Sequence, residues 1–126
     1  TYFTLTKRTD TMNSHRGEVC FMGGKRDQTD LDDVFTAYRE AKEECNLNKE
    51  DTIFLAQLCP LITFNQVLVT PVVVYFDKNN FKPQLNQNEV DLIFDLPTER
   101  FLSKVNHKIK CIKNDSGEYY IHHFKD

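Results

Sequence analysis

Three glutamates, Glu40, Glu43 and Glu44, lie close together in the middle of this chain. In an α-helix, the spacing i, i+3 and i+4 gathers their carboxylates on one side of the rod. Because like charges at this distance repel, a helix keeps such a cluster either on a solvated face or around a cation. Hard divalent cations such as Mg²⁺ take oxygen ligands and share them with the phosphates of a substrate. The pattern therefore leaves two interpretations open, a solvated helix face and a site for metal-assisted phosphate chemistry.

The helix that must position these glutamates is predicted from its start and from its apolar face. Asp32 or Asp33 can supply the N-cap, and the helix is expected to run to about residue 45. An apolar stripe at i, i+4, i+7 and i+11 is formed by Val34, Tyr38, Ala41 and Cys45. The glutamates begin about 60° beyond the edge of this stripe. We therefore expect the stripe to pack against a sheet and the glutamates to lie beside that contact.

The rest of the chain is predicted to consist mainly of strands. The first segment alternates apolar and polar residues, and several later segments are rich in Val, Ile, Leu and Phe. The strand candidates are residues 2–6, 19–21, 53–63, 67–76, 90–96, 109–112 and 119–124. The order of two strands, one helix and then several strands predicts an α+β fold. We expect residues 1–126 to form a single domain.

The overall composition excludes several classes of protein. The chain has 126 residues, of which 40% are hydrophobic and 28% charged, and its net charge is −3. This composition is typical of a globular domain. The chain also lacks the excess of basic residues that is typical of a nucleic-acid-binding protein. No apolar run is long enough for a membrane span, and the first residues lack the pattern of a signal peptide. The four cysteines form no C-x-x-C pair, which favours reduced thiols and an intracellular location.

The helix and the loop before it resemble the Nudix box, the signature of enzymes that hydrolyse nucleoside diphosphates linked to another group. The general pattern is Gly, five residues, Glu, seven residues, and then Arg-Glu-apolar-x-Glu-Glu-x-Gly-apolar. Residues 39–47 (REAKEECNL) match the helical half of this pattern. The loop half differs, because Gly24 lies fifteen residues before Arg39 instead of fourteen, and its acidic position is Asp30.

The longer loop is similar to that of one branch of this family, the coenzyme A diphosphatases. Residues 5–9 (LTKRT) and 17–24 (GEVCFMGG) resemble the second signature of that branch, Leu-Leu-Thr-x-Arg-Ser followed later by Gly-x-x-x-Phe-Pro-Gly-Gly. Residues 17–27 look especially like the peroxisomal members. The resemblance extends from about residue 3 to about residue 97.

Three residues depart from the family pattern. Met22 stands where the branch has Pro, and Asn13 stands where it has Arg, with Arg16 nearby as a possible substitute. Asn46 replaces the Gly just past the helix, which is a mild change because Asn tolerates the left-handed conformation better than most residues. The change at Asn13 weakens the coenzyme A signature and leaves other substrates open.

The resemblance implies roles for the acidic residues of the box and for the arginine before them. Glu40 and Glu44 are expected to bind a metal ion, with Glu43 as a further ligand or as the base. Arg39 is expected to orient one glutamate, and a simple surface ion pair with Glu43 is the alternative. Glu89 stands where the branch has an acid that completes the metal site or acts as base, although an ordinary loop glutamate is the alternative. Whether Glu43 or Glu89 is the base stays open.

The same resemblance implies a fold, a cofactor and a reaction. We expect a Nudix-like α/β/α sandwich with a mixed central sheet, a Mg²⁺ or Mn²⁺ cofactor, and phosphate contacts from Arg8, Arg16 and Lys25, each of which has a solvated basic residue as its alternative. The implied enzyme hydrolyses the diphosphate of coenzyme A or an acyl-CoA to 3′,5′-ADP and (acyl-)4′-phosphopantetheine. The alternatives are a Nudix hydrolase acting on ADP-ribose or another nucleoside diphosphate derivative, and a non-catalytic Nudix-like binding module.

The ends of the chain lead to one further expectation. The sequence opens in a strand candidate without Met and closes in another, so we expect a fragment of a protein that is longer at both ends. A peroxisomal location is suspected from the resemblance alone, because this chain has no Ser-Lys-Leu-like ending. The missing pieces are expected to cover apolar surface.

Overall fold

Helix α1 (Asp33–Cys45) confirms the expected helix. It belongs to a computed structural model that describes residues 1–11, 15–63, 65–115 and 117–124. The side chain of Asp32 accepts a 2.7 Å hydrogen bond from the N–H of Phe35 and thereby caps the first turn. At the other end, Asn46 takes the left-handed conformation, with φ 62° and ψ 30°, and its N–H donates to the Lys42 carbonyl at 3.0 Å. Asn46 therefore does what Gly does at this position of the family pattern.

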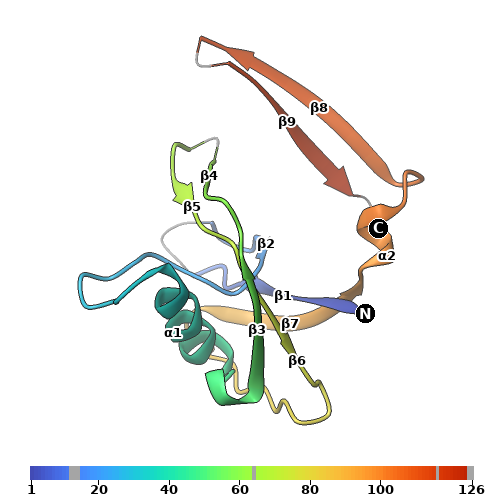
Figure 1. The fold of residues 1–126 in the computed structure, drawn as a ribbon. Helices are drawn as coiled ribbons and strands as arrows, with labels where there is room; N and C mark the ends of the chain where they lie inside the picture. Colours follow the sequence, from blue (N-terminus) through green and yellow to red (C-terminus); the bar gives the residue numbers. More distant parts are fainter. Residues whose placement is uncertain (12–14, 64, 116, 125–126) are drawn as a thin grey trace. The chain divides into compact units, whose positions relative to one another are not determined.

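The described strands form four small sheets (Figure 1). The first has the order β2-β1-β7 and contains β1 (Tyr2–Arg8), β2 (Val19–Cys20) and β7 (Val90–Pro97). The other three are antiparallel pairs: β3 (Thr52–Gln57) with β6 (Val72–Phe76), β4 (Leu61–Ile62) with β5 (Leu68–Val69), and β8 (His107–Asn114) with β9 (Gly117–Phe124). A 3₁₀ turn, η1 (Lys49–Asp51), follows α1, and a short helix, α2 (Glu99–Leu102), follows β7.

Two of the strand candidates were too long. Residues 53–63 form β3 and β4 with a gap between them, and residues 67–76 form β5 and β6. Pro60 and Pro71 lie in the two gaps, and a proline cannot donate a hydrogen bond to a neighbouring strand. The Pro71 carbonyl instead accepts a 2.9 Å hydrogen bond from Leu58 N–H, which joins the two gaps. The prolines therefore divide the two expected strands into four shorter ones, of which β3 pairs with β6 and β4 with β5.

The chain divides into two compact units. The larger unit spans residues 5–94 and holds α1 and the buried apolar residues Leu5, Ala41, Cys45, Leu47 and Val90. The smaller unit combines residues 1–4 with the described residues from 95 onward, and its aromatic contacts include Phe101 edge-on to Phe3 at 5.4 Å and to Phe124 at 5.1 Å. Every residue expected to serve the site belongs to the larger unit.

These elements confirm the α+β class. The described antiparallel pairs do not establish the α/β/α sandwich or its mixed central sheet, which therefore stay predictions, as does the single domain. None of the described helices is both long and apolar enough to cross a membrane.

Candidate metal and diphosphate site

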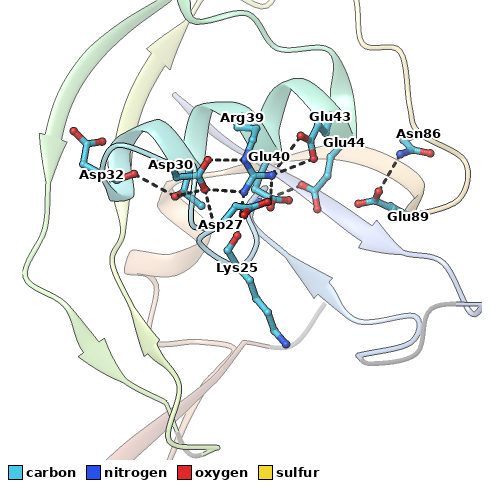
Figure 2. Close-up of polar contacts among 12 residues, drawn as sticks. Lys25, Asp27, Asp30, Asp32, Arg39, Glu40, Glu43, Glu44, Asn86 and Glu89 are labelled. Atoms are coloured by element: carbon cyan, nitrogen blue, oxygen red, sulfur yellow. Dashed lines mark hydrogen bonds and ion pairs between the residues drawn. The ribbon is translucent and has the colours of Figure 1, made fainter.

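Arg39 lies at the centre of a polar network on one side of α1. Its Nε and Nη2 donate to the two carboxylate oxygens of Asp30, each at 2.9 Å, in a two-pronged contact. Its Nη1 donates to Glu40 at 2.8 Å and to Glu43 at 3.2 Å. Figure 2 shows Arg39 with Asp30 on one side and the two glutamates on the other. Arg39 is thus more than the partner of a single surface ion pair, because it ties the loop to the acidic face of the helix.

Asp30 anchors this network from the loop before the helix. Its side chain is fully buried and also accepts hydrogen bonds from Asp27 N–H at 2.9 Å and from the Thr36 hydroxyl at 2.8 Å. The Arg39 guanidinium, followed by the Asp27 N–H, holds the pKa of this carboxyl well below its usual range. The same contact with Asp30 raises the pKa of Arg39. The sequence pattern marks Asp30 as the acidic position of the box without predicting its role, and the contact with Arg39 is what the structure adds.

Glu44 points into the protein. The whole residue is 1% exposed, and its carboxylate accepts a 3.1 Å hydrogen bond from Gly23 N–H. Its nearest cationic contact in the described structure is Arg8, whose Nη1 lies 3.7 Å from Glu44 Oε1. Burial raises the pKa of Glu44 to about 7, against the opposing effects of Gly23 N–H and Arg8. A solvated face therefore does not describe Glu44.

The other two glutamates differ in exposure. The side chain of Glu40 is 13% exposed, whereas that of Glu43 is 50% exposed. A methyl group added at Gly24 would overlap the Glu40 carboxylate, so the glycine leaves room for this side chain. The solvated-face interpretation therefore fits Glu43 only in part and does not fit Glu40.

A loop of the same unit brings Glu89 to the end of α1. The N–H groups of Gln84 and Asn86 donate to the carbonyls of Cys45 and Glu44, at 3.1 and 3.0 Å. The Asn86 side chain then donates to the Glu89 carboxylate at 3.0 Å (Figure 2). The charges of Glu40 and Glu89 raise the pKa of Glu44 further, so both carboxylates lie near enough to Glu44 to affect its charge.

The basic residues expected to contact phosphate are placed differently from one another. Arg8 ends β1 beside Glu44, as described above. Lys25 is exposed, and although its carbonyl accepts a 3.0 Å hydrogen bond from Arg39, its side chain extends away from the carboxylates in Figure 2. Arg16 is exposed, and Asn13 lies outside the described residues. Of the three, the structure brings Arg8 to the glutamates.

The side chains at this site have the chemistry of a site for a hard cation. Glu40, Glu43, Glu44 and Glu89 offer carboxylate oxygens, the ligands that Mg²⁺ takes in proteins. Burial, and to a smaller extent the charges of Glu40 and Glu89, raise the pKa of Glu44, and a divalent cation beside this carboxylate would offset both effects. In the described residues, however, no group of three or more Asp, Glu, His or Cys side chains is already placed around one metal position. Glu40 and Glu43 accept hydrogen bonds from Arg39. Glu44 accepts one from Gly23 N–H and lies near the Arg8 guanidinium.

The sequence pattern of this site and its similarity to curated proteins agree on a class: the chain belongs to the Nudix hydrolase family. It is 40% identical to the peroxisomal coenzyme A diphosphatase NUDT7 of Mus musculus over 124 residues, which are 98% of this chain and 52% of that protein. It is 38% identical over 121 residues to Nudix hydrolase 15, mitochondrial, of Arabidopsis thaliana, with 95% of this chain and 42% of that protein covered. It is also 38% identical over 123 residues to Nudix hydrolase 22, chloroplastic, of the same plant, with 97% and 40% covered. No protein-family model matches the chain.

The chain spans about half the length of the curated relatives it matches, or somewhat less. The names of the three relatives refer to three different organelles. The peroxisomal location therefore stays a prediction.

Proposed function

We propose that this chain carries the catalytic site of a Mg²⁺- or Mn²⁺-dependent Nudix pyrophosphohydrolase that acts on coenzyme A or an acyl-CoA. The observation that carries the proposal is the acidic cluster on α1, in which Glu44 is buried and Glu40 and Glu43 are held by Arg39. Burying a carboxylate among other carboxylates is unfavourable unless a cation compensates it. A bound divalent ion would therefore stabilise the cluster by offsetting its negative charge.

The proposed reaction hydrolyses the P–O–P bridge of the substrate. The oxygen of water forms a bond to one phosphorus, and the bridging oxygen leaves with the other, giving 3′,5′-ADP and (acyl-)4′-phosphopantetheine. A bound Mg²⁺ or Mn²⁺ would neutralise charge on the diphosphate and lower the pKa of the attacking water. In this proposal Glu40 and Glu44 hold the ion, and Arg39 fixes the direction of Glu40 and Glu43.

Two carboxylates are candidates for the base that accepts the proton of water. Glu43 is half-exposed and already lies on the acidic face of α1, but it is engaged by Arg39. Glu89 is held by Asn86 on a separate loop and can approach the same region from another side. Replacing each by Gln and comparing the pH dependence of kcat distinguishes them, because loss of the base removes the acidic limb of the profile.

The substrate class is supported by two observations. Residues 5–9 and 17–24 resemble the signature of coenzyme A diphosphatases, and the mouse relative is named as one. A hydrolase of ADP-ribose or of another nucleoside diphosphate derivative is the alternative within the family. A Nudix-like binding module without catalytic activity is the alternative that is not an enzyme. The partner in each case is a small molecule.

The test is a substrate panel with Mg²⁺ or Mn²⁺, in which nucleotide products are separated and quantified. We expect turnover of coenzyme A above that of ADP-ribose, and loss of turnover with a chelator. Glu44→Gln should lower kcat at least about a hundredfold, because it removes charge from the site without changing its shape. Glu50→Gln, on the exposed turn η1, is the matched control and should leave kcat unchanged. Near-normal turnover by Glu44→Gln would refute the site, and preferred turnover of ADP-ribose would move the chain to the first alternative.

A further inference from the structure

The guanidinium of Arg8 is poorly satisfied for a buried cation. Arg8 is the last residue of β1, and its N–H donates to the Glu18 carbonyl at 2.9 Å, which fixes the backbone. Its side chain is only 17% exposed. The Nε atom is buried and has no hydrogen-bond partner among the described residues. A buried donor without an acceptor is unfavourable, so this guanidinium is prepared for an anion that can reach it.

Arg8 is close enough to Glu44 to neutralise it, but the contact is not a hydrogen bond. The 3.7 Å between Nη1 and Oε1 exceeds the length of an N–H···O hydrogen bond. Arg39, by contrast, donates hydrogen bonds to Glu40 at 2.8 Å and to Glu43 at 3.2 Å. Arg39 is thus hydrogen-bonded to Glu40 and Glu43, whereas Arg8 contacts Glu44 over a longer distance and without a hydrogen bond.

We propose that Arg8 is the counterion of Glu44 in the metal-free protein and gives up this carboxylate when a divalent cation binds, after which its guanidinium takes an oxygen of the diphosphate. This inference rests on the proposed function and places Arg8 beside Glu44, one of the proposed metal ligands. A divalent cation in direct contact with Glu44 attracts this carboxylate more strongly than the single positive charge of Arg8 does at 3.7 Å. The same cation also repels the Arg8 guanidinium. The fork of a guanidinium fits phosphate oxygens, and the Nε, which has no acceptor among the described residues, is free to donate to one of them.

The experiment measures two affinities at pH 8 with the whole chain. Mn²⁺ binding without substrate is followed by electron paramagnetic resonance, and binding of methylenediphosphonate, a diphosphate that resists hydrolysis, is followed by calorimetry at saturating Mn²⁺. Arg8→Met should bind Mn²⁺ severalfold more tightly than the wild type, because the competing charge is gone. It should bind methylenediphosphonate at least about tenfold more weakly.

Two further variants keep the test sharp. Lys7→Met is the matched control, since Lys7 is the neighbouring basic residue of β1 and points to the opposite face of the strand. It should change neither affinity by more than about twofold. Arg8→Lys keeps the charge but loses the fork, so it should bind Mn²⁺ like the wild type and methylenediphosphonate more weakly. This variant also covers the case in which Arg8→Met does not fold.

The outcomes separate this inference from the proposed function. A purely structural Arg8 would give weaker Mn²⁺ binding in Arg8→Met, or unchanged affinity for methylenediphosphonate, and either result overturns the inference. If the two affinities change as expected while coenzyme A is not hydrolysed by the wild type, the role of Arg8 stands and the proposed substrate is wrong. If the wild-type chain binds no Mn²⁺, both fail together.

Discussion

Burial of Glu44 predicts that the metal-free protein loses stability as the pH rises from about 5 to about 8. The pKa of Glu44 is raised to about 7 from its ordinary 4.5, mainly because the side chain is buried. Between these two values the folded protein keeps a proton that the unfolded chain has lost, so the free energy of unfolding falls as the pH rises. The contribution is fully present below pH 4.5 and is lost as the pH passes 7.

The size of this effect follows from the difference between the two pKa values. That difference corresponds to about 3 kcal/mol as an upper bound, and relaxation of a buried site reduces it to about 1–2 kcal/mol. For a chain of this length, a change of 1 kcal/mol corresponds to about 4 °C in Tm. The low pKa of Asp30 acts in the opposite direction, but only at pH values below 4, so the two contributions are separate.

The assay is thermal unfolding followed by circular dichroism in EDTA at pH 5, 6, 7 and 8. Changes of charge elsewhere in the chain affect both proteins alike, so the quantity of interest is the difference in Tm between the wild type and Glu44→Gln. This difference should favour Glu44→Gln increasingly as the pH rises, by about 4–8 °C between pH 5 and pH 8. Glu43→Gln is the control, since that side chain on the same helix is half-exposed and should show no such trend. Parallel curves for the wild type and Glu44→Gln would refute the reasoning.

Three further predictions concern the residues around the glutamates. Arg39→Lys keeps the charge but loses the two-pronged contact with Asp30, and because Glu40 would then be misplaced, kcat should fall about a hundredfold; unchanged steady-state kinetics would contradict this. Gly24→Ala should weaken Mn²⁺ binding severalfold in a paramagnetic-resonance titration, because the added methyl displaces the Glu40 carboxylate, and equal affinity would show that Glu40 is not a ligand. Asn46→Ala should lower the free energy of unfolding in urea by about 1 kcal/mol, because alanine is strained in the left-handed conformation that Asn46 adopts; no change in the urea midpoint would contradict that cost.

The helix of this site could be predicted because its signals are local. Asp32 caps the first turn and Asn46 ends the last, and both functions depend on neighbouring residues only. The lengths of the strands could not be predicted as well. The candidates at 53–63 and 67–76 are rich in strand-forming side chains on both sides of Pro60 and Pro71, and the backbone of these prolines divides them.

The burial of Glu44 could not be predicted from the helical pattern. Ala41 and Cys45 of the expected apolar stripe are buried, but Val34 and Tyr38 are only partly buried, and the buried face extends instead towards Glu44. The cause is distant in the sequence, since Gly23 and Arg8 cover this side of the helix. A helical wheel contains no information about such segments, and so it leaves a buried carboxylate and a solvated one indistinguishable.

The balance of charge around α1 connects these observations. The carboxylates of the site come from Asp30, Glu40, Glu43, Glu44 and Glu89. The cations that contact them in the network described above are the two guanidinium groups of Arg39 and Arg8, while the Lys25 side chain extends away in Figure 2. Negative charge therefore exceeds positive charge, and protonation of Glu44 removes only part of the excess. Because the single charge of Arg39 is shared by Asp30, Glu40 and Glu43, and Arg8 is the cation beside Glu44, the remaining excess lies on the face of α1 that carries Glu40 and Glu44, where we propose that the metal ion binds.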